Sequence, residues 1–298
     1  MSKPLVSIVI ATYNRREHLE SAINSALKQT YDNVEIVVVC NSTDNTPALF
    51  TDGAKFDLEN IQYHHIDERM GVAKARNFGY EKAKGDILIT IDDDAIFKNE
   101  HVTSVVAKAF QNHRTLGILA FRVVNAHTGE IETLPHKDKD IDPNKPFTAP
   151  YFIGCGNAIR SSVFDDVGYY PESFRYGAEE LDLSYRTIDA GYTIKYLPEA
   201  TVIHKESPHG RFEDATVRRY LVENRIRFVV RNFPWRYAIP YMCIWSLYGL
   251  YLSRLNPQPV FKAYRTAFGE RHSLLEKRSV ISKETIEYLK HHSGRLLY

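Results

Sequence analysis

Apolar runs alternate with helical stripes over the first hundred residues of the chain. Three short runs rich in apolar residues, 5–11, 34–39 and 87–91, have the length of buried strands, and 61–66 predicts a further strand. Between them, apolar residues recur at helical spacing over 16–29 and 71–83, and Pro47 suits the first position of a further helix. This alternation predicts an α/β fold built on a parallel, doubly wound sheet.

Polar residues follow three of these predicted strands. They are Thr12-Tyr13-Asn14, Cys40-Asn41-Ser42 and Asp92-Asp93-Asp94. In an open α/β sheet, ligands bind at the carboxyl ends of the strands. The three polar segments therefore predict one binding site at this edge of the sheet.

The second half of the chain has a less regular pattern. It predicts strands at 117–124, 152–160, 193–197 and 201–204, a short helix over 161–167 and a longer one over 179–190 that ends at Gly191. Residues 135–150 form a polar loop that contains proline. Beyond residue 214 we expect long helices rich in basic and aromatic side chains.

Composition is that of a globular protein with enough apolar material for a sizeable core. The chain has 298 residues, and its three cysteines, Cys40, Cys155 and Cys243, are far apart and form no CxxC pair. This spacing argues against a disulfide framework or a zinc knuckle and favours a reducing compartment. The apolar run at 5–11 is too short for a signal-peptide core, so we expect a cytoplasmic protein.

The formal net charge of +1 hides an asymmetry. Residues 215–298 hold 15 Lys and Arg against 5 Asp and Glu, a local charge of +10, and the remainder carries −9. A basic tail on an acidic body predicts contact with an anionic surface. Because the tail is rich in Trp, Tyr and Leu, we expect lipid headgroups rather than nucleic acid.

The three adjacent aspartates indicate a cation site. Unpaired carboxylates at a buried strand end repel one another, and a bound Mg²⁺ or Mn²⁺ removes that cost. In an extended segment, Asp92 and Asp94 point the same way and Asp93 points to the opposite side. The alternative is a solvated acidic turn or a helix N-cap.

Five segments in sequence order resemble the family 2 glycosyltransferases of the GT-A fold. They are VSIVIATYNR (6–15), GVAKARNFG (71–79), IDDD (91–94), FRYGAEELDL (174–183) and PEATVIH (198–204). The resemblance covers roughly residues 4–210. It implies a Rossmann-like, mostly parallel sheet flanked by helices, with a helical C-terminal extension.

The resemblance also implies a donor site that contains a metal ion. Asp94 would bind the ion, Asp92 would lie near the ribose or the metal's water shell, and His204 would complete the metal shell. Tyr13 would stack on the base, and Arg76 would face the base or the diphosphate. The residues expected to contact the nucleotide are Thr12, Tyr13, Asn14, Arg15, Cys40, Asn41, Arg76, Asp92 and Asp93.

Glu180 matches the family's catalytic base, which takes the proton of the acceptor hydroxyl. The family usually has Glu-Asp here and this chain has Glu-Glu, so the base is either Glu180 or Glu179. Acids in the first turn of a helix are also favoured by its dipole alone. Gly154, Gly156, Asn157 and Asp182 are expected near the donor sugar and the acceptor.

Cys40 is a departure from the family's pattern, because the family commonly has an aspartate there that accepts a hydrogen bond from the imide N–H of uracil. A cysteine is a poor acceptor, so UDP-, dTDP- and GDP-sugar donors all stay open.

Residues 238–252 carry no charge but contain Pro240 and Gly249. A spanning helix needs about 20 residues, so we expect either an interfacial helix or a helix that packs on the enzyme domain or on a second subunit. Arg231, Arg236 and Arg254 would flank the interfacial helix.

The sequence thus predicts an inverting, metal-dependent glycosyltransferase that acts on a lipid-linked or polysaccharide glycan. We expect a domain over 1–214, with a nucleotide-sugar half (1–98) and an acceptor half (99–214), and a tail over 215–298. We expect peripheral contact with the cytoplasmic face of the membrane, or a homo-oligomer. Two alternatives are a catalytically inactive relative that acts as a partner subunit, and a nucleotidyltransferase. The latter needs a glycine-rich loop after the first strand, and residues 11–16 contain no glycine.

Overall fold

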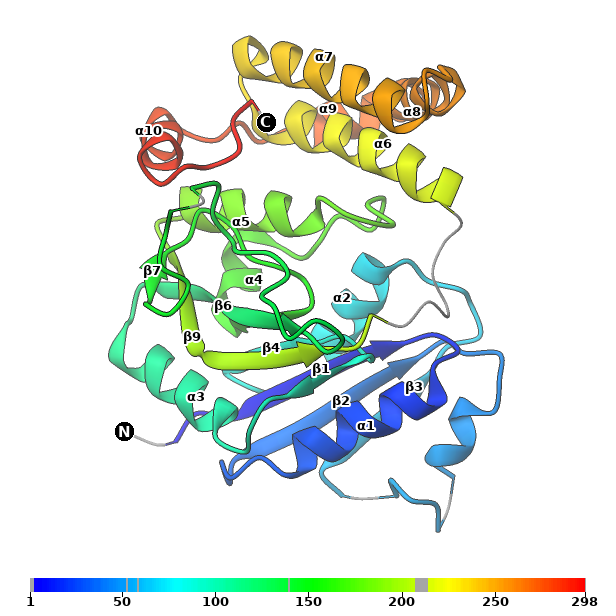
Figure 1. Cartoon of the computed structure of the whole chain (residues 1–298), viewed down its shortest axis with the longest axis vertical. Coiled ribbons are helices and arrows are strands. Elements are labelled where there is room, and N and C mark those ends of the chain that lie inside the picture. The colour runs from blue at the N-terminus through cyan, green and yellow to red at the C-terminus, as the bar shows by residue number, and fades with distance from the viewer. Residues whose placement is uncertain (1–2, 52, 58, 139, 207–213, 298) are drawn as a thin grey trace.

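The computed structural model describes residues 3–51, 53–57, 59–138, 140–206 and 214–297 and places one sheet between helices (Figure 1). The first half of the chain builds four strands: β1 (Val6–Thr12), β2 (Val34–Cys40), β3 (Ile61–His65) and β4 (Ile87–Ile91). They lie in the order β3-β2-β1-β4 and pair in parallel, with Val6 opposite Val34 and Thr12 opposite Cys40. The predicted strand–helix alternation is therefore confirmed in this half.

Helices cover both faces of the sheet. The helices are α1 (Arg16–Leu27), α2 (Val72–Lys82), α3 (Val102–Asn112), α4 (Ser161–Val167) and α5 (Glu179–Asp189), and Thr46–Leu49 forms one short 3₁₀ turn. On β4, Ile89 packs into the core under α1 and α3, whereas Leu88 packs into the core under α2, α4 and α5. Burial on both faces explains why β4 is apolar except for the buried Thr90.

The second half of the sheet is mixed rather than parallel. It consists of β5 (Ala95–Phe97), β6 (Leu116–Asn125), β7 (Phe147–Thr148), β8 (Gly156–Arg160) and β9 (Thr193–His204). β8 is antiparallel to both β4 and β6, and β6 is parallel to β9. The two strands predicted at 193–197 and 201–204 form one strand, β9, with a register shift opposite Phe121 and Arg122. The sequence pattern predicted neither β5 nor α3.

Five helices form the C-terminal extension, above α5 in Figure 1: α6 (Asp214–Asn232), α7 (Trp235–Leu252), α8 (Gln258–Gly269), α9 (Arg271–Glu276) and α10 (Lys283–His291). Two rings pack on Tyr185 of α5. The ring centroid of Phe228, on α6, lies 5.3 Å from that of Tyr185, and the centroid of Phe233, in the loop after α6, lies 5.9 Å from it. The extension therefore shares a core with the sheet domain. The segment 207–213 lies outside the described residues, and the junction at 214 stays a prediction.

The other side of α7 is exposed. Ile239, Cys243, Leu247 and Tyr251 are all exposed and recur at every fourth residue, which places them in one stripe. Among the described residues, no helix has the length and apolar character that crossing a membrane requires. The prediction that Arg231 flanks an interfacial helix is wrong, because Arg231 is turned inward and paired with Asp182.

Candidate active site

A cavity of about 460 Å³ opens at the carboxyl ends of β1, β2 and β4. This is the edge at which the sequence predicts a site. Most of the predicted site residues lie on its wall: Thr12, Tyr13, Arg15, Asn41, Arg76, Asp92, Asp93, Asp94, Gly154, Glu179, Glu180 and His204. Segments as far apart in the chain as Thr12 and His204 thus meet around one cavity.

The acidic cluster after β4 is neutralised from within the chain. Asp93 accepts a hydrogen bond from the Thr12 hydroxyl at 2.7 Å and one from Arg15 Nη1, also at 2.7 Å. Burial raises the pKa of Asp93 to about 6, although the Arg15 guanidinium acts in the opposite direction. The same Arg15 Nη1 lies 3.0 Å from Asp94 Oδ2. Arg15 therefore holds two of the three carboxylates together.

His204, the last residue of β9, reaches the cluster from the other side. Its Nε2 lies 3.3 Å from Asp94 Oδ1, and its Nδ1 lies 3.0 Å from Glu132. Burial alone would lower the pKa of His204, but hydrogen bonds to Asp94, Cys155 and Glu132 raise it to about 12. The ring is therefore a cation among carboxylates.

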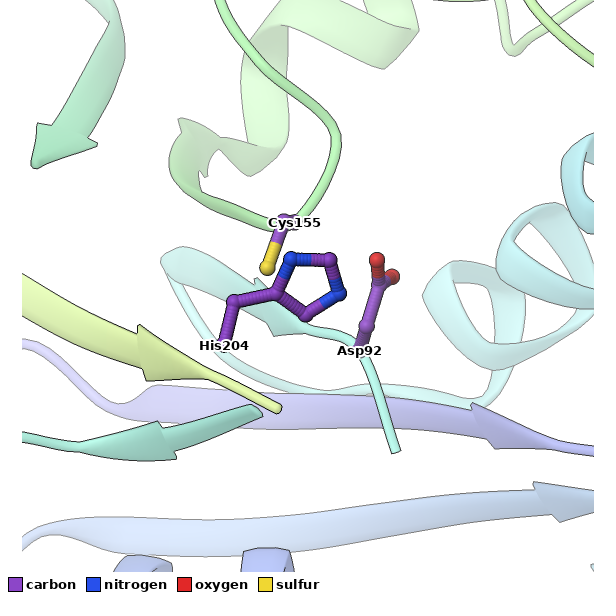
Figure 2. A group of neighbouring side chains, drawn as sticks. All are labelled: Asp92, Cys155 and His204. Carbon is purple, nitrogen blue, oxygen red and sulfur yellow. The ribbon is translucent and has the colours of Figure 1, made fainter. Parts of the chain in front are cut away.

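The residues around His204 fit a divalent ion. Asp92, Cys155 and His204 offer ligand atoms that all lie within 4.8 Å of one another, and Figure 2 shows the three side chains converging. Asp94 is already in contact with His204. Carboxylate oxygens and imidazole nitrogens are ligands for Mg²⁺, Mn²⁺ and related ions. Such an ion would supply the positive charge that Arg15 and His204 provide in its absence.

Arg76, on α2, links the acidic cluster to the next helix. Its side chain is buried, and its Nη2 donates to Asp92 Oδ1 at 2.8 Å and to the Gly154 carbonyl at 3.2 Å. Its Nη1 lies 3.5 Å from Glu180 Oε1 and 3.8 Å from Glu179 Oε1. One guanidinium thus fixes carboxylates on both sides of the cavity.

Two glutamates form the first turn of α5. The preceding Ala178 has φ 73°, a left-handed conformation that turns the chain into the helix. Glu179 is buried, and burial together with the neighbouring Glu180 carboxyl raises its pKa well above the ordinary value. The Glu180 side chain is 20% exposed. The pair therefore contains one enclosed carboxyl group and one that faces the cavity.

Gly154 allows the backbone to approach this pair closely. A β-carbon at position 154 would lie 2.2 Å from Glu180 Oε1 and 2.9 Å from Arg76 Nη1. Only glycine fits without moving these groups.

One end of the cavity contains an aromatic ring and a cation. The Arg69 guanidinium lies 4.6 Å from the centre of the Tyr13 ring. The Asn41 amide donates to the Thr12 carbonyl and accepts from the Met70 amide. The Arg69–Tyr13 contact and the Asn41 hydrogen bonds hold this end of the cavity in place, and the Tyr13 ring offers a flat face to a planar ligand.

Two predicted nucleotide contacts, Asn14 and Cys40, do not lie on the cavity wall. Cys40 is fully buried in the core, because its position on β2 turns the thiol away from the cavity. Asn14 turns to the neighbouring loop, where its side-chain Oδ1 accepts from the Thr43 backbone amide at 2.8 Å and its backbone amide donates to the Ser42 hydroxyl. Both residues therefore support the cavity wall without lining it.

Three predicted substrate contacts lie behind the cavity wall rather than on it. Gly156 is buried in β8, where a β-carbon would lie 2.8 Å from Val202. Asn157 is fully buried and donates to the Gly154 carbonyl. Asp182 is fully buried too, and its carboxylate is bound by arginines of α5 and α6. The contacts of all three residues are therefore with other parts of the chain.

Sequence reasoning missed several groups at the cavity. Glu132 binds His204, and Glu132, His204 and Glu206 form a second set of possible metal ligands. Arg69 and Cys155 also line the cavity. Glu132 follows the turn at Thr128-Gly129, but nothing in the local pattern indicates that this turn reaches β9.

Solved structures share this architecture. A structure of GalNAc-T7 with UDP, GalNAc and Mn²⁺ has a TM-score of 0.68 and 19% identity, covering 97% of this chain and 58% of that one. The mannosyltransferase PcManGT of Pyrobaculum calidifontis with GDP-Man and Mn²⁺ has a TM-score of 0.60 and 19% identity, covering 100% and 81%. These likenesses confirm the GT-A-like fold.

Relatives in sequence agree with this fold. An uncharacterized protein of Haemophilus influenzae is 31% identical over 184 residues, which are 57% of this chain and 95% of the relative. An uncharacterized glycosyltransferase of Rickettsia felis is 28% identical over 179 residues, and there the chain spans 29% of the relative's length. The model of the family described as glycosyl transferase family 2 matches residues 7–168, more than half of the chain. The chain belongs to glycosyl transferase family 2 and is a glycosyltransferase.

Proposed function

We propose that the chain transfers a sugar from a UDP-, dTDP- or GDP-sugar to a hydroxyl of a lipid-linked or polysaccharide glycan, with inversion at the anomeric carbon and with a divalent ion. One observation carries this proposal. Arg76 lies between Asp92 of the acidic cluster and Glu180 of α5, so the charge-binding side and the base side face one cavity. This arrangement suits a single displacement in which one side holds the leaving group and the other activates the acceptor.

Asp92, Asp94 and His204 would hold the ion, as in the expectation from the sequence. A bound ion stabilises negative charge on the departing nucleoside diphosphate. Arg15 and Arg76 can place further positive charge beside the diphosphate, because both reach the same carboxylates from the cavity wall. The structural neighbours bound to Mn²⁺ and to UDP or GDP-Man support this reading.

Glu180 is the favoured base. Its side chain is 20% exposed toward the cavity, whereas that of Glu179 is only 3% exposed, so Glu180 is the better placed of the two to reach an acceptor hydroxyl. Arg76 Nη1 orients the Glu180 carboxylate and limits its movement toward the acidic cluster. Tyr13 and Arg69 would enclose the nucleotide base, and Thr12, Asn41 and Asp93 would shape that end of the cavity.

The C-terminal helices support a site of action at the cytoplasmic face of an anionic membrane. The exposed stripe of Ile239, Leu247 and Tyr251 on α7 is accompanied by exposed Arg236 and Arg254. Phe261 and Phe268 are exposed on α8. An apolar stripe beside basic residues suits an interfacial helix, and a lipid-linked acceptor would meet the enzyme there.

Vesicle flotation tests the membrane contact. Each basic side chain near an anionic surface adds about 1 kcal/mol, so R236Q/R254Q should bind anionic vesicles ~30-fold more weakly. A matched control is K28Q/K98Q, which removes two exposed cations from the sheet domain. Equal binding by both variants, or a dimer in sedimentation that Leu247→Ser disrupts without any vesicle binding, would instead favour an oligomer interface.

Donor turnover tests the activity. The wild-type protein is incubated with UDP-, dTDP- and GDP-sugars, with and without Mn²⁺, and released nucleoside diphosphate is measured. We expect diphosphate release from one donor class, dependent on the ion. Pyrophosphate release from nucleoside triphosphates would indicate a nucleotidyltransferase, and donor binding without turnover would indicate an inactive partner subunit.

A further inference from the structure

We propose that Asp92, Cys155 and His204 form a binding site for a thiolate-accepting divalent ion of the zinc class, which excludes the ion of catalysis. The inference rests on the proposed function only in that Asp92 and His204 are shared with the Mg²⁺ or Mn²⁺ site. Cys155 is the additional ligand.

Backbone pairing holds the three ligands together. Asp92 follows β4, and its amide donates to the Cys155 carbonyl at 3.3 Å, next to the pairing of Ile91 with Gly156. His204 is fixed by the pairing of β9 with β5, where it lies opposite Ala95. The ligand atoms consequently come from three separate segments and lie within 4.8 Å of one another (Figure 2). A site built on paired strands needs little rearrangement to close around an ion.

The chemistry of the set differs from that of a magnesium site. One thiol, one imidazole and one carboxylate are a mixed S, N, O set, which Zn²⁺ and Co²⁺ accept readily, whereas Mg²⁺ prefers oxygen. Three protein ligands leave a fourth position for water or for another group. Asp94 Oδ1, 3.3 Å from His204 Nε2, is a further carboxylate oxygen beside the set.

Binding of the ion to these three ligands balances in protons and charge. When the ion binds, the Cys155 S–H proton and the extra proton of the His204 imidazolium leave for solvent. The sulfur lone pair then forms the metal–thiolate bond, and the freed imidazole nitrogen pair forms the second bond. Two positive charges enter and two protons leave, so the net charge of the centre is unchanged.

This site implies competition between two kinds of ion. Asp92 and His204 cannot serve a zinc-class ion through Cys155 and a catalytic ion at the same time. Cys155 is 7% exposed and lines the cavity, so an ion can reach it from the donor side. Zinc-class ions should therefore inhibit donor turnover by displacing Mg²⁺ or Mn²⁺.

Cobalt spectroscopy of the reduced full-length chain tests the site. We expect a thiolate-to-cobalt charge-transfer band in wild type that one equivalent of Zn²⁺ bleaches. The band should be lost in Cys155→Ser, with Zn²⁺ affinity lowered at least ~100-fold, and kept in Cys243→Ser, which removes an exposed thiol elsewhere. A band that persists in Cys155→Ser, or a wild type without one, overturns the proposal.

X-ray absorption at the zinc edge gives a test that needs no variant at Cys155. The Cys243→Ser protein loaded with one equivalent of Zn²⁺ should show one sulfur ligand at about 2.3 Å. A shell of oxygen and nitrogen alone refutes the thiolate ligand. A wild type that shows the sulfur ligand but turns over no donor with Mn²⁺ contradicts the proposed function and leaves this inference standing.

Discussion

Asp182 offers the sharpest test of how the C-terminal helices are held. It is fully buried on α5, and its Oδ2 lies 2.8 Å from the Arg186 guanidinium. Its Oδ1 accepts from Arg231 Nε at 3.2 Å and from the Asn232 amide at 2.7 Å, both on α6. Asp182→Asn keeps the shape but removes the charge that two arginines require.

The expected cost follows from these contacts. Removing one partner of a buried ion pair costs about 3–5 kcal/mol. Arg186 also donates to the carbonyls of Val167, Gly168 and Tyr169, so part of its charge stays satisfied. We therefore take the lower end, about 3 kcal/mol, which lowers the melting temperature by about 6–12 °C.

The effect should depend on pH in a defined direction. Burial alone would raise the pKa of Asp182, but Arg186 and Arg231 hold it below the ordinary value. A lowered folded-state pKa gives stability that is present above the unfolded value of about 3.9 and is lost as the pH falls through the folded value. The difference in melting temperature between wild type and Asp182→Asn should be constant from neutral pH to about 5 and should close in acid.

Differential scanning calorimetry measures these quantities. Asp32→Asn is the control, because Asp32 makes an exposed pair with Lys3 and should shift the melting temperature little. An Asp182→Asn protein that melts with wild type but has lost donor turnover at low temperature would refute the structural role. It would restore the contact with substrate that the sequence predicts.

Three further predictions concern the cavity. Glu180→Gln should lower turnover ~10²–10⁴-fold with donor affinity nearly unchanged, whereas Glu179→Gln should be mild; the reverse order in single-turnover assays would move the base to Glu179. Asp94→Ala should abolish ion-dependent donor binding in calorimetry, and full activity in excess EDTA would contradict a metal role. Gly154→Ala should slow turnover ~10²-fold, because a β-carbon 2.2 Å from Glu180 Oε1 displaces the base; Gly269→Ala, where nothing lies within 4 Å, is the control, and equal rates would mean that Glu180 tolerates displacement.

The sequence predicted the parts of the site that depend on strand ends. Thr12 ends β1 and Asp92 to Asp94 follow β4, and these two strands pair in parallel, so the convergence of these residues follows from the strand–helix alternation. Cys40 was misplaced for a local reason: the last residue of a strand can face either side, and one position decides between cavity and core. Periodicity gives the element but not which face the final side chain takes.

Other features depend on pairings that no local pattern encodes. Glu132 reaches His204 over 72 positions in the chain, because β6 and β9 lie side by side. Asp182 meets Arg231 over 49 positions, across two helices. An acid in the first turn of a helix is usually explained by the helix dipole. The partners of Asp182 on α6 become known only from the packing of α6 on α5.

The Asp182 contacts also restrict how members of this family can exchange their C-terminal parts. α5 carries Glu180 in its first turn, and the same helix is bound to α6 through Arg231 and Asn232. A chimera that joins the sheet domain of this chain to the helices of another member must supply a cation and a donor at these two places. Without them the chimera would bury a carboxylate beside Arg186 alone, two residues from Glu180. A change in acceptor specificity could then not be told apart from damage to the cavity wall.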